Sequence, residues 1–431
     1  MLFQFSRGSQ SFFSLRQSQS KESSSGQLTV IDSRTSRRYQ IPIANNAVQA
    51  VDIGRIFIGD EFDYSERVNN ALKVLDPGFS NTAVMTSSVT FVYVSAPRCK
   101  DWIALLILHS NSDGMKGEIY YRDHSIDDLF GHVSFEEVAH LLIWNHLPSP
   151  EERARFRASL NARLSPPASA MKAINILPRD APPVSVIIAG LAAYAAANPS
   201  KVPTTANDPL MYRSNMQVID NGILDSLATM AVVISLLYCH QRGHAFLPAN
   251  PDKSFIENVL IMMGFVDKTT DLPHPRTVRT LDSLWILYLD HEMTNSTAAL
   301  LHVASTLADP ISCCIGMVAS ANGPLHGGAI DLAYKKFEEL ESPSNVPALI
   351  KDVKAKKLRL FGYGHRIYKT VDPRAKYLRA MLEEFSEESK SNPLLAIAME
   401  IDREASTDEY FTSRNLKANA DLYGCFVYTA L

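Results

Sequence analysis

The sequence predicts a mainly α-helical fold, in a chain of 431 residues that is long enough for one large domain or two. Apolar residues recur at helical spacing over most of the chain after Ser134, and proline, glycine and asparagine separate these stretches. The hydrophobic share of 46% suits a globular protein with a substantial core. We therefore expect a helical protein with few strands.

A short strand pair is expected before the helical part. Residues Leu28 to Ile43 alternate in places between apolar and polar side chains and contain Val30, Ile31 and Tyr39, which favour strands. Residues 1–27 form a separate segment whose beginning is rich in serine and basic residues and lacks acids up to Lys21. This composition fits a mitochondrial transit peptide and a disordered tail equally well.

Two helix starts are marked by serine caps. Ser134 is followed by Glu137, and Ser149 is followed by Pro150 and Glu152, so each serine has an acid three residues later. Further helices are predicted over Val184–Ala197, Leu224–Cys239, Leu281–Leu289, Thr297–Leu307, Ala329–Leu340, Val346–Lys357, Ala375–Glu388 and Leu394–Glu404.

Charge and cysteine content exclude several classes of protein. The net charge of -4, without long basic runs, argues against nucleic acid as a partner. We find no apolar run that approaches the ~20 residues of a membrane span, and so expect no membrane partner. The five cysteines show no CxxC spacing, which favours structural thiols over disulfides or a metal site and argues against secretion. Mitochondrial and cytoplasmic locations both remain open.

The most informative motifs are two histidines in glycine-rich turns. His326 lies in the turn Gly323–Gly328, and His365 follows the glycines of Gly362–Gly364. Arg374 follows nine residues after His365, in an Asp-Pro-Arg sequence. Neutral imidazoles can donate to carbonyl oxygens, and a guanidinium can bind a carboxylate with two hydrogen bonds. Together these groups could polarise two carbonyl substrates at once.

These motifs resemble those of the citrate synthase family, and more its bacterial and plant peroxisomal branch than the animal mitochondrial one. The resemblance covers most of the chain. Its other segments are Leu28–Ile43, Asp76–Gly78, Tyr121–Ile126, Asp290–Glu292, Asn295–Thr297, Asp408–Phe411 and Asn419–Gly424. It implies a citrate synthase-like fold with a large helical domain, residues 28–327, and a small helical domain, residues 328–431, that closes over the substrate.

The resemblance also implies roles for individual residues. Asp421 matches the base that takes the α-proton of an acyl-CoA, His326 the donor to the thioester oxygen, and His365 the donor to the ketone of oxaloacetate. His291 and Arg374 match residues that hold oxaloacetate. The loop that touches CoA corresponds to Leu360, Phe361, Gly362, Tyr363 and Gly364. No metal and no cofactor are implied, since the CoA thioester is a substrate, and the family works as a homodimer.

Two segments depart from the family pattern. Residues 93–112 form an atypical insertion with an apolar run, which we interpret as a retained intron, with a true insertion as the alternative. The chain ends soon after Asp421, so we expect the family's C-terminal segment, with its two further substrate-binding arginines, to be missing.

Two functions remain open at the level of sequence. The first is condensation of an acyl-CoA with oxaloacetate to give citrate or an alkylcitrate, the latter as in fungal alkylcitrate synthases of secondary metabolism. Unusual residues before His326 and Asp421 favour this specialised member. The second is a truncated, non-catalytic homologue that acts as a subunit or pseudoenzyme.

Overall fold

The computed structural model describes residues 25–60, 62–76, 87–93, 118–365, 368, 371–385, 387 and 391–431. The described residues up to Asp76 belong to one compact unit, and those from Ser87 onward to a second unit. The predicted insertion at 93–112 lies outside the described residues except for Tyr93, and the predicted tail lies outside them up to residue 24.

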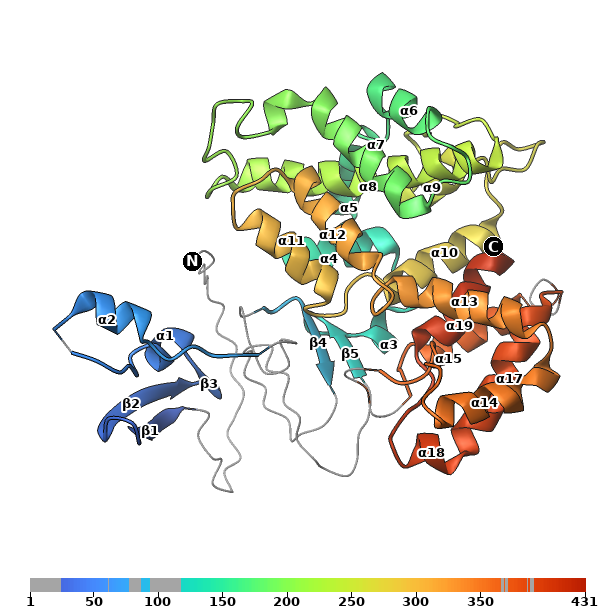
Figure 1. The fold of residues 1–431 in the computed structure, drawn as a ribbon. Helices are drawn as coiled ribbons and strands as arrows, with labels where there is room; N and C mark the ends of the chain where they lie inside the picture. The colour runs from blue at the N-terminus through green and yellow to red at the C-terminus, as the bar shows by residue number, and fades with distance from the viewer. Residues whose placement is uncertain are drawn as a thin grey trace, which may run out of the picture. The chain divides into compact units, whose positions relative to one another are not determined.

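The first unit is a small antiparallel sheet with two short helices (Figure 1). Strand β1 pairs with β2, with Leu28 opposite Ile41, and β2 turns back into β3. The strand pair expected over Leu28–Ile43 is therefore confirmed. The bounds are Gly26–Asp32 for β1, Arg37–Ala44 for β2, Ala47–Val48 for β3, Ala50–Ile53 for α1 and Tyr64–Asn69 for α2.

The second unit begins with an antiparallel sheet of β4 (Thr90–Tyr93), β5 (Glu118–Tyr121) and β6 (His124–Ser125). Tyr121, at the end of β5, is completely buried. Its hydroxyl lies 2.9 Å from the carbonyl oxygen of Ile286 and 3.1 Å from that of Asp290. The sheet thus anchors the segment that leads to His291.

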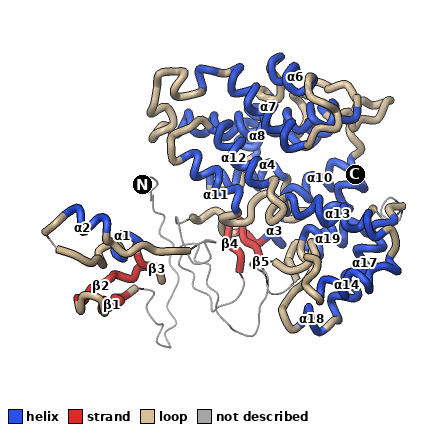
Figure 2. The backbone as a smooth tube through the Cα atoms, viewed as in Figure 1, coloured by secondary structure: helices blue, strands red, loops and turns tan. Residues whose placement is uncertain are grey.

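Helices make up most of the rest of the second unit (Figure 2), so the mainly α prediction is confirmed. Ser134 and Ser149 both form capping boxes, as predicted. The first group of helices is α3 Ile126–Leu129, α4 Phe135–Trp144, α5 Pro150–Asn161, α6 Ala168–Asn175, α7 Pro183–Ala197, α8 Met216–Arg242, α9 Phe255–Met262, α10 Pro275–Leu287, α11 Asn295–Ala304 and α12 Pro310–Ala321, with a 3₁₀ turn at Pro199–Lys201.

A second group of helices follows Gly327 and is drawn in orange and red in Figure 1. Its members are α13 Gly328–Leu340, α14 Val346–Lys354, α15 Ala375–Glu384, α17 Pro393–Thr407, α18 Glu409–Thr412 and α19 Ala420–Ala430, with a 3₁₀ turn at Pro343–Asn345. Helix α19 packs against both α13 and α15. The boundary between a large and a small domain at Gly327 and Gly328 stays a prediction.

Helix α8 contradicts the expectation that no apolar stretch approaches the length of a membrane span. It spans 27 residues and has a mean hydropathy of 1.8 over its most apolar window, which is long and apolar enough to cross a membrane. However, 67% of that window is buried inside the protein. This burial is typical of the central helix of a globular core. The helix predicted from the sequence, Leu224–Cys239, is shorter than α8 because Asp220 and Asp225 interrupt the apolar pattern near its start.

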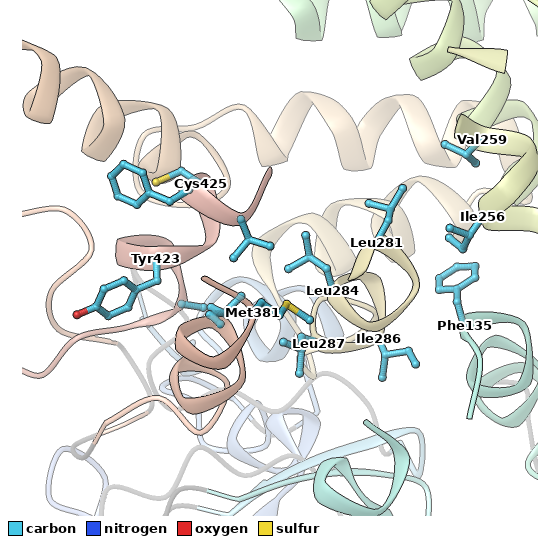
Figure 3. Packing of buried hydrophobic residues seen from close by; sticks show 14 of the residues in the cluster. Phe135, Ile256, Val259, Leu281, Leu284, Ile286, Leu287, Met381, Tyr423 and Cys425 are labelled. Atoms are coloured by element: carbon cyan, nitrogen blue, oxygen red, sulfur yellow. The ribbon is translucent and has the colours of Figure 1, made fainter. Parts of the chain in front are cut away.

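Helix α10 connects the two groups of helices through the core (Figure 3). Its side chains Leu281, Leu284 and Leu287 lie between Phe135 with its neighbours on one side and Met381 with its neighbours on the other. Leu284 and Leu287 are completely buried. The segment after α10 therefore starts from a rigid support, and this is the segment that carries His291.

The described cysteines are buried and not disulfide-bonded, in agreement with the expected structural thiols. They are Cys239, Cys313, Cys314 and Cys425, whereas Cys99 lies outside the described residues. Burial raises the pKa of each of these four thiols. They are therefore poor nucleophiles.

Candidate active site

The turn that carries His326 joins α12 to α13. It is closed by hydrogen bonds within the turn, including one of 2.9 Å from the His326 amide to the Gly323 carbonyl. A Cβ atom at Gly328 would lie 2.6 Å from the backbone oxygen of Asn322. A side chain cannot fit there, so the glycine is required by the close approach of two backbone segments.

Ser296 fixes the protonation of the His326 ring. The Ser296 amide donates to His326 Nε2 at 3.4 Å, and the Ser296 hydroxyl lies 2.8 Å from the same nitrogen. A backbone N–H can only donate, so Nε2 is the acceptor and the neutral ring carries its proton on Nδ1. Burial lowers the pKa of His326, which favours this neutral form. Its Nδ1–H is thus a neutral hydrogen-bond donor.

The turn that precedes His365 is held by a distant part of the chain. The Gly364 amide donates to the Lys417 carbonyl at 2.7 Å, and the Asn419 amide donates to the Gly362 carbonyl at 3.1 Å. Gly362 and Gly364 have φ angles of 80° and 81°, which non-glycine residues rarely adopt. The segment is therefore joined to the residues just before α19.

The His365 ring has the opposite tautomer to His326. The Tyr368 amide donates to His365 Nδ1 at 3.2 Å, so the proton of the neutral ring lies on Nε2. The Tyr368 ring stacks on the imidazole with a centroid distance of 4.6 Å. This stacking covers one face of the His365 imidazole and restricts its rotation.

His291 lies next to His365. The centroids of the two rings are 5.3 Å apart, and His291 Nε2 lies 2.9 Å from the buried Tyr368 hydroxyl. Burial, together with the charge of Arg374, lowers the pKa of His291. The structure therefore brings together the two histidines that the resemblance assigned to oxaloacetate, and it keeps His291 neutral.

Arg374 is a buried cation paired with Asp372. Its exposed fraction is 8%, and its Nε and Nη2 atoms donate to the two carboxylate oxygens of Asp372 at 3.0 and 2.7 Å. Burial alone would raise the pKa of Asp372, but Arg374 outweighs burial and lowers it to about 2. The guanidinium also lies 5.3 Å from the centroid of the Tyr288 ring. Arg374 is thus charged and immobilised.

Asp421 lies in the first turn of α19. The amide of Ala420, its neighbour, donates to Asp372 at 3.2 Å, and the Asp421 amide donates to the Asn419 side chain at 2.9 Å. Burial raises the pKa of Asp421, and the positive charge of Arg374 opposes this shift. A carboxylate with a raised pKa is a stronger base than an exposed one.

The segment Leu360–Gly364 has mostly structural contacts. Leu360 and Tyr363 are buried, and the Tyr363 hydroxyl donates to Asp402 at 2.7 Å. These side chains hold the segment in place, so contact with CoA would fall to its backbone and to the half-buried Phe361. The CoA assignment stays a prediction.

Several residues of the site were not assigned a role from the sequence. Ser296 and Asp372 lie inside recognised motifs, but their role in fixing a tautomer and a charge depends on side-chain geometry. Tyr288 and Tyr368 carried no signal of their own, because an aromatic residue in a helical chain is usually part of the core.

Fold and site together define a helical protein that presents two neutral histidine donors, a buried arginine and a carboxylate of raised pKa. Residues 78–431 match the family model described as "Citrate synthase, C-terminal domain". The chain belongs to the citrate synthase family. Family members are transferases that use an acyl-CoA and oxaloacetate as substrates, without a metal or other cofactor.

The most informative relatives are fungal. The citrate synthase-like protein oryE of Aspergillus oryzae is 44% identical over 94% of this chain and 86% of its own length. The alkylcitrate synthase phiJ of a fungal species is 36% identical over 94% of this chain and 84% of its own. Among solved structures, the ternary complex of citrate synthase from Thermoplasma acidophilum with carboxymethyl coenzyme A and oxaloacetate has a TM-score of 0.69 and 25% identity, covering 83% of this chain and 84% of that one.

Proposed function

We propose that the protein condenses an acyl-CoA with oxaloacetate and hydrolyses the resulting thioester, giving citrate or an alkylcitrate and free CoA. The observation that carries this proposal is that a backbone amide donates to Nε2 of His326 and another to Nδ1 of His365, so the two rings can donate from opposite edges, together with the raised pKa of Asp421. Each histidine can donate one hydrogen bond to a carbonyl oxygen without carrying a positive charge.

The first step is removal of the α-proton of the acyl-CoA by the Asp421 carboxylate. A carboxylate is too weak a base to produce a free enolate, so the thioester oxygen must be stabilised as negative charge develops on it. His326 Nδ1–H supplies that hydrogen bond, and Ser296 holds its ring in the required tautomer.

The second step forms the carbon–carbon bond. The α-carbon attacks the ketone carbon of oxaloacetate, and the ketone oxygen becomes a hydroxyl by taking a proton from His365 Nε2. The proton held by Asp421 then returns to His365, so the oxygen gains the proton that the acyl-CoA lost and both side chains regain their starting forms. Water then cleaves the C–S bond, placing its hydroxyl on the acyl carbon and its proton on the CoA thiolate.

Arg374 and His291 bind oxaloacetate in this proposal. The Nε and Nη2 atoms of Arg374 already donate to Asp372, so a substrate carboxylate would approach the Nη1 side of the guanidinium. Because the guanidinium is fixed before the substrate arrives, little side-chain entropy is lost on binding.

The acyl group is proposed to be longer than acetyl. The support for this is the similarity to alkylcitrate synthases, which extends over 94% of the chain in both phiJ and tstJ at 36% and 35% identity. A product of this kind would belong to secondary metabolism.

The proposal is tested by measuring thiol release from acetyl-, butyryl-, hexanoyl- and longer acyl-CoAs with and without oxaloacetate. We expect oxaloacetate-dependent release that is greatest for a chain longer than acetyl. His326→Ala should abolish it, whereas His302→Ala, at an exposed histidine on α11, should not. Release only from acetyl-CoA would exclude an alkylcitrate as the product. No release by the folded protein would favour the non-catalytic alternative.

A further inference from the structure

Three potential metal ligands meet where α4 ends and α5 begins, in a region with no role in the proposed condensation. His140 lies on α4, His146 lies in the connection, and Glu152 lies in the first turn of α5. Each offers one ligand atom, and these atoms all lie within 4.8 Å of one another. Their closeness depends on the left-handed conformation of Asn145, with φ of 67°, which ends α4 and turns the chain back.

Both imidazoles are oriented by backbone carbonyls. His140 Nδ1 lies 3.0 Å from the carbonyl oxygen of His146, and His146 Nδ1 lies 3.1 Å from that of Trp144. A carbonyl can only accept, so each Nδ1 carries a proton, and each neutral ring has its lone pair on Nε2. This arrangement is the usual outer support of metal-binding histidines, which donate their other ring N–H to a backbone carbonyl or carboxylate.

The two carboxylate oxygens of Glu152 have different partners. One, Oε2, accepts the Ser149 amide at 2.9 Å in the capping box, and the other, Oε1, lies 3.3 Å from His146 Nε2. Because His146 Nδ1 faces the Trp144 carbonyl, the Nε2 atom of His146 and the Oε1 atom of Glu152 face each other as two potential ligand atoms.

We propose that this cluster binds a divalent cation of the zinc class, with Nε2 of His140, Nε2 of His146 and Oε1 of Glu152 as ligands. Two imidazoles and one carboxylate are a ligand set typical of zinc, with the fourth position left to water. Zn–N bonds of about 2.1 Å place tetrahedral ligands roughly 3.4 Å apart, so the cluster must contract slightly on binding. The His146 and Glu152 side chains are 52% and 34% exposed and can rotate to do so.

His140 supplies the rigid part of the site. It is 6% exposed and packs against Trp144 and Phe156, with ring centroids 4.7 and 5.8 Å away. A cation would therefore tie the end of α4 to the start of α5 through one buried and two movable ligands. The competing explanation is a proton, which would make His146 an imidazolium paired with Glu152.

The test uses the full-length, metal-free protein and zinc chloride, titrated in competition with a chromogenic chelator. We expect wild type to bind zinc in a saturable manner and His146→Gln and Glu152→Gln each to lower this affinity more than tenfold. The matched control is His132→Gln, at an exposed histidine outside the cluster. Circular dichroism without metal checks that each variant is folded, and His140 is left intact because its burial makes a folding defect the expected result.

A second measurement separates coordination from non-specific binding. Cobalt(II) in place of zinc should give a visible absorption band with wild type and His132→Gln, and a weaker or shifted band with His146→Gln and Glu152→Gln. The proposal is overturned if wild type shows no saturable zinc binding, which would leave the proton explanation. Equal affinity in all four proteins would also overturn it, because the zinc would then be held elsewhere.

Discussion

The two histidine turns look alike in sequence but are held in place by different means. The turn of His326 closes on backbone atoms of Asn322 and Gly323, a few residues away, and Leu325 in this turn is 75% exposed. The segment Gly362–Gly364 is hydrogen-bonded to residues 417–419, more than fifty positions later in the chain. The first turn is therefore local, whereas the second forms only when α19 is docked.

The difference extends to the chemistry of the two rings. His326 is left with a proton on Nδ1 and His365 with a proton on Nε2, because in each case a backbone amide occupies the other nitrogen. Two glycine-histidine motifs thus present opposite edges of the imidazole. In the proposed mechanism, the same residue type would donate to two carbonyl oxygens from two directions.

Asp421→Asn should have the largest effect on activity. Asp421 lies in α19, next to the residues that hold the Gly362–Gly364 turn but not the turn of His326. Under the proposed mechanism this variant loses its general base, which should lower kcat by about 10²- to 10⁴-fold. The pKa of Asp421 is raised by burial, so above that pKa the protein carries a penalised charge, and the variant should be more stable than wild type at pH 7.

Denaturant unfolding and thiol release measure the two effects of this variant together. A loss of both activity and stability would mean that the carboxylate is structurally required. Asp331→Asn, at an exposed position in the first turn of α13, is the control and should change neither property.

Asp372→Asn tests the buried ion pair between Asp372 and Arg374. It leaves the Arg374 guanidinium buried without a counter-ion, and such changes cost about 3–5 kcal/mol in the free energy of unfolding. Because the folded pKa of Asp372 is about 2, below the ordinary value of 3.8, the stabilisation is present above pH 3.8 and is lost as pH falls toward 2. The difference in free energy of unfolding between wild type and variant should therefore decrease as the pH falls from 3.8 toward 2.

The control for this change is Asp352→Asn, which removes one partner of the exposed pair with Lys357. Its effect should be within about 0.5 kcal/mol of zero. Equal effects of the two variants in urea unfolding would contradict the burial argument.

Amide substitutions test the opposite tautomers directly. The side-chain amide of asparagine can replace Nδ1–H of histidine, and that of glutamine can replace Nε2–H. Removing a donor to a developing oxyanion costs roughly 10²- to 10³-fold in kcat. We expect His326→Asn to retain about tenfold more activity than His326→Gln, and His365→Gln about tenfold more than His365→Asn, a difference of about 1.4 kcal/mol. The same preference at both positions would show that one tautomer is wrong.

Alanine substitutions compare the backbones of the two turns. A Cβ at Gly364 would lie 2.9 Å from Leu416 Cδ2 and would adopt a φ of +81°, which should cost about 1–3 kcal/mol. A Cβ at Gly323 would have its nearest contact at 3.5 Å, without a positive φ, so Gly323→Ala should be neutral or stabilising by up to about 1 kcal/mol. Thermal unfolding of the two variants compares the turns.

Much of the helical fold could be predicted, because capping and periodicity act over a few residues. Ser134 and Ser149 begin helices as expected, and the predicted helix Val184–Ala197 differs from α7 by one residue. Helices α9 and α12 were missed for different reasons. Helix α9 has only 8 residues and is almost entirely buried, whereas α12 consists of apolar and small residues without a charged face. The predicted helix Ala375–Glu388 ends earlier, at Glu384.

The sequence by itself determined the family and the helical class, and it indicated His291, His326, His365, Arg374 and Asp421 as candidate site residues. These follow from local patterns and from motifs that stand in order along the chain. Only the tertiary structure decided which nitrogen of each histidine carries the proton, that Arg374 is paired with Asp372, and that α19 holds the second turn. The physical reason is that a tautomer, a charge pair and a raised pKa depend on contacts between residues such as Ser296 and His326, which are distant in sequence and meet only in the folded chain.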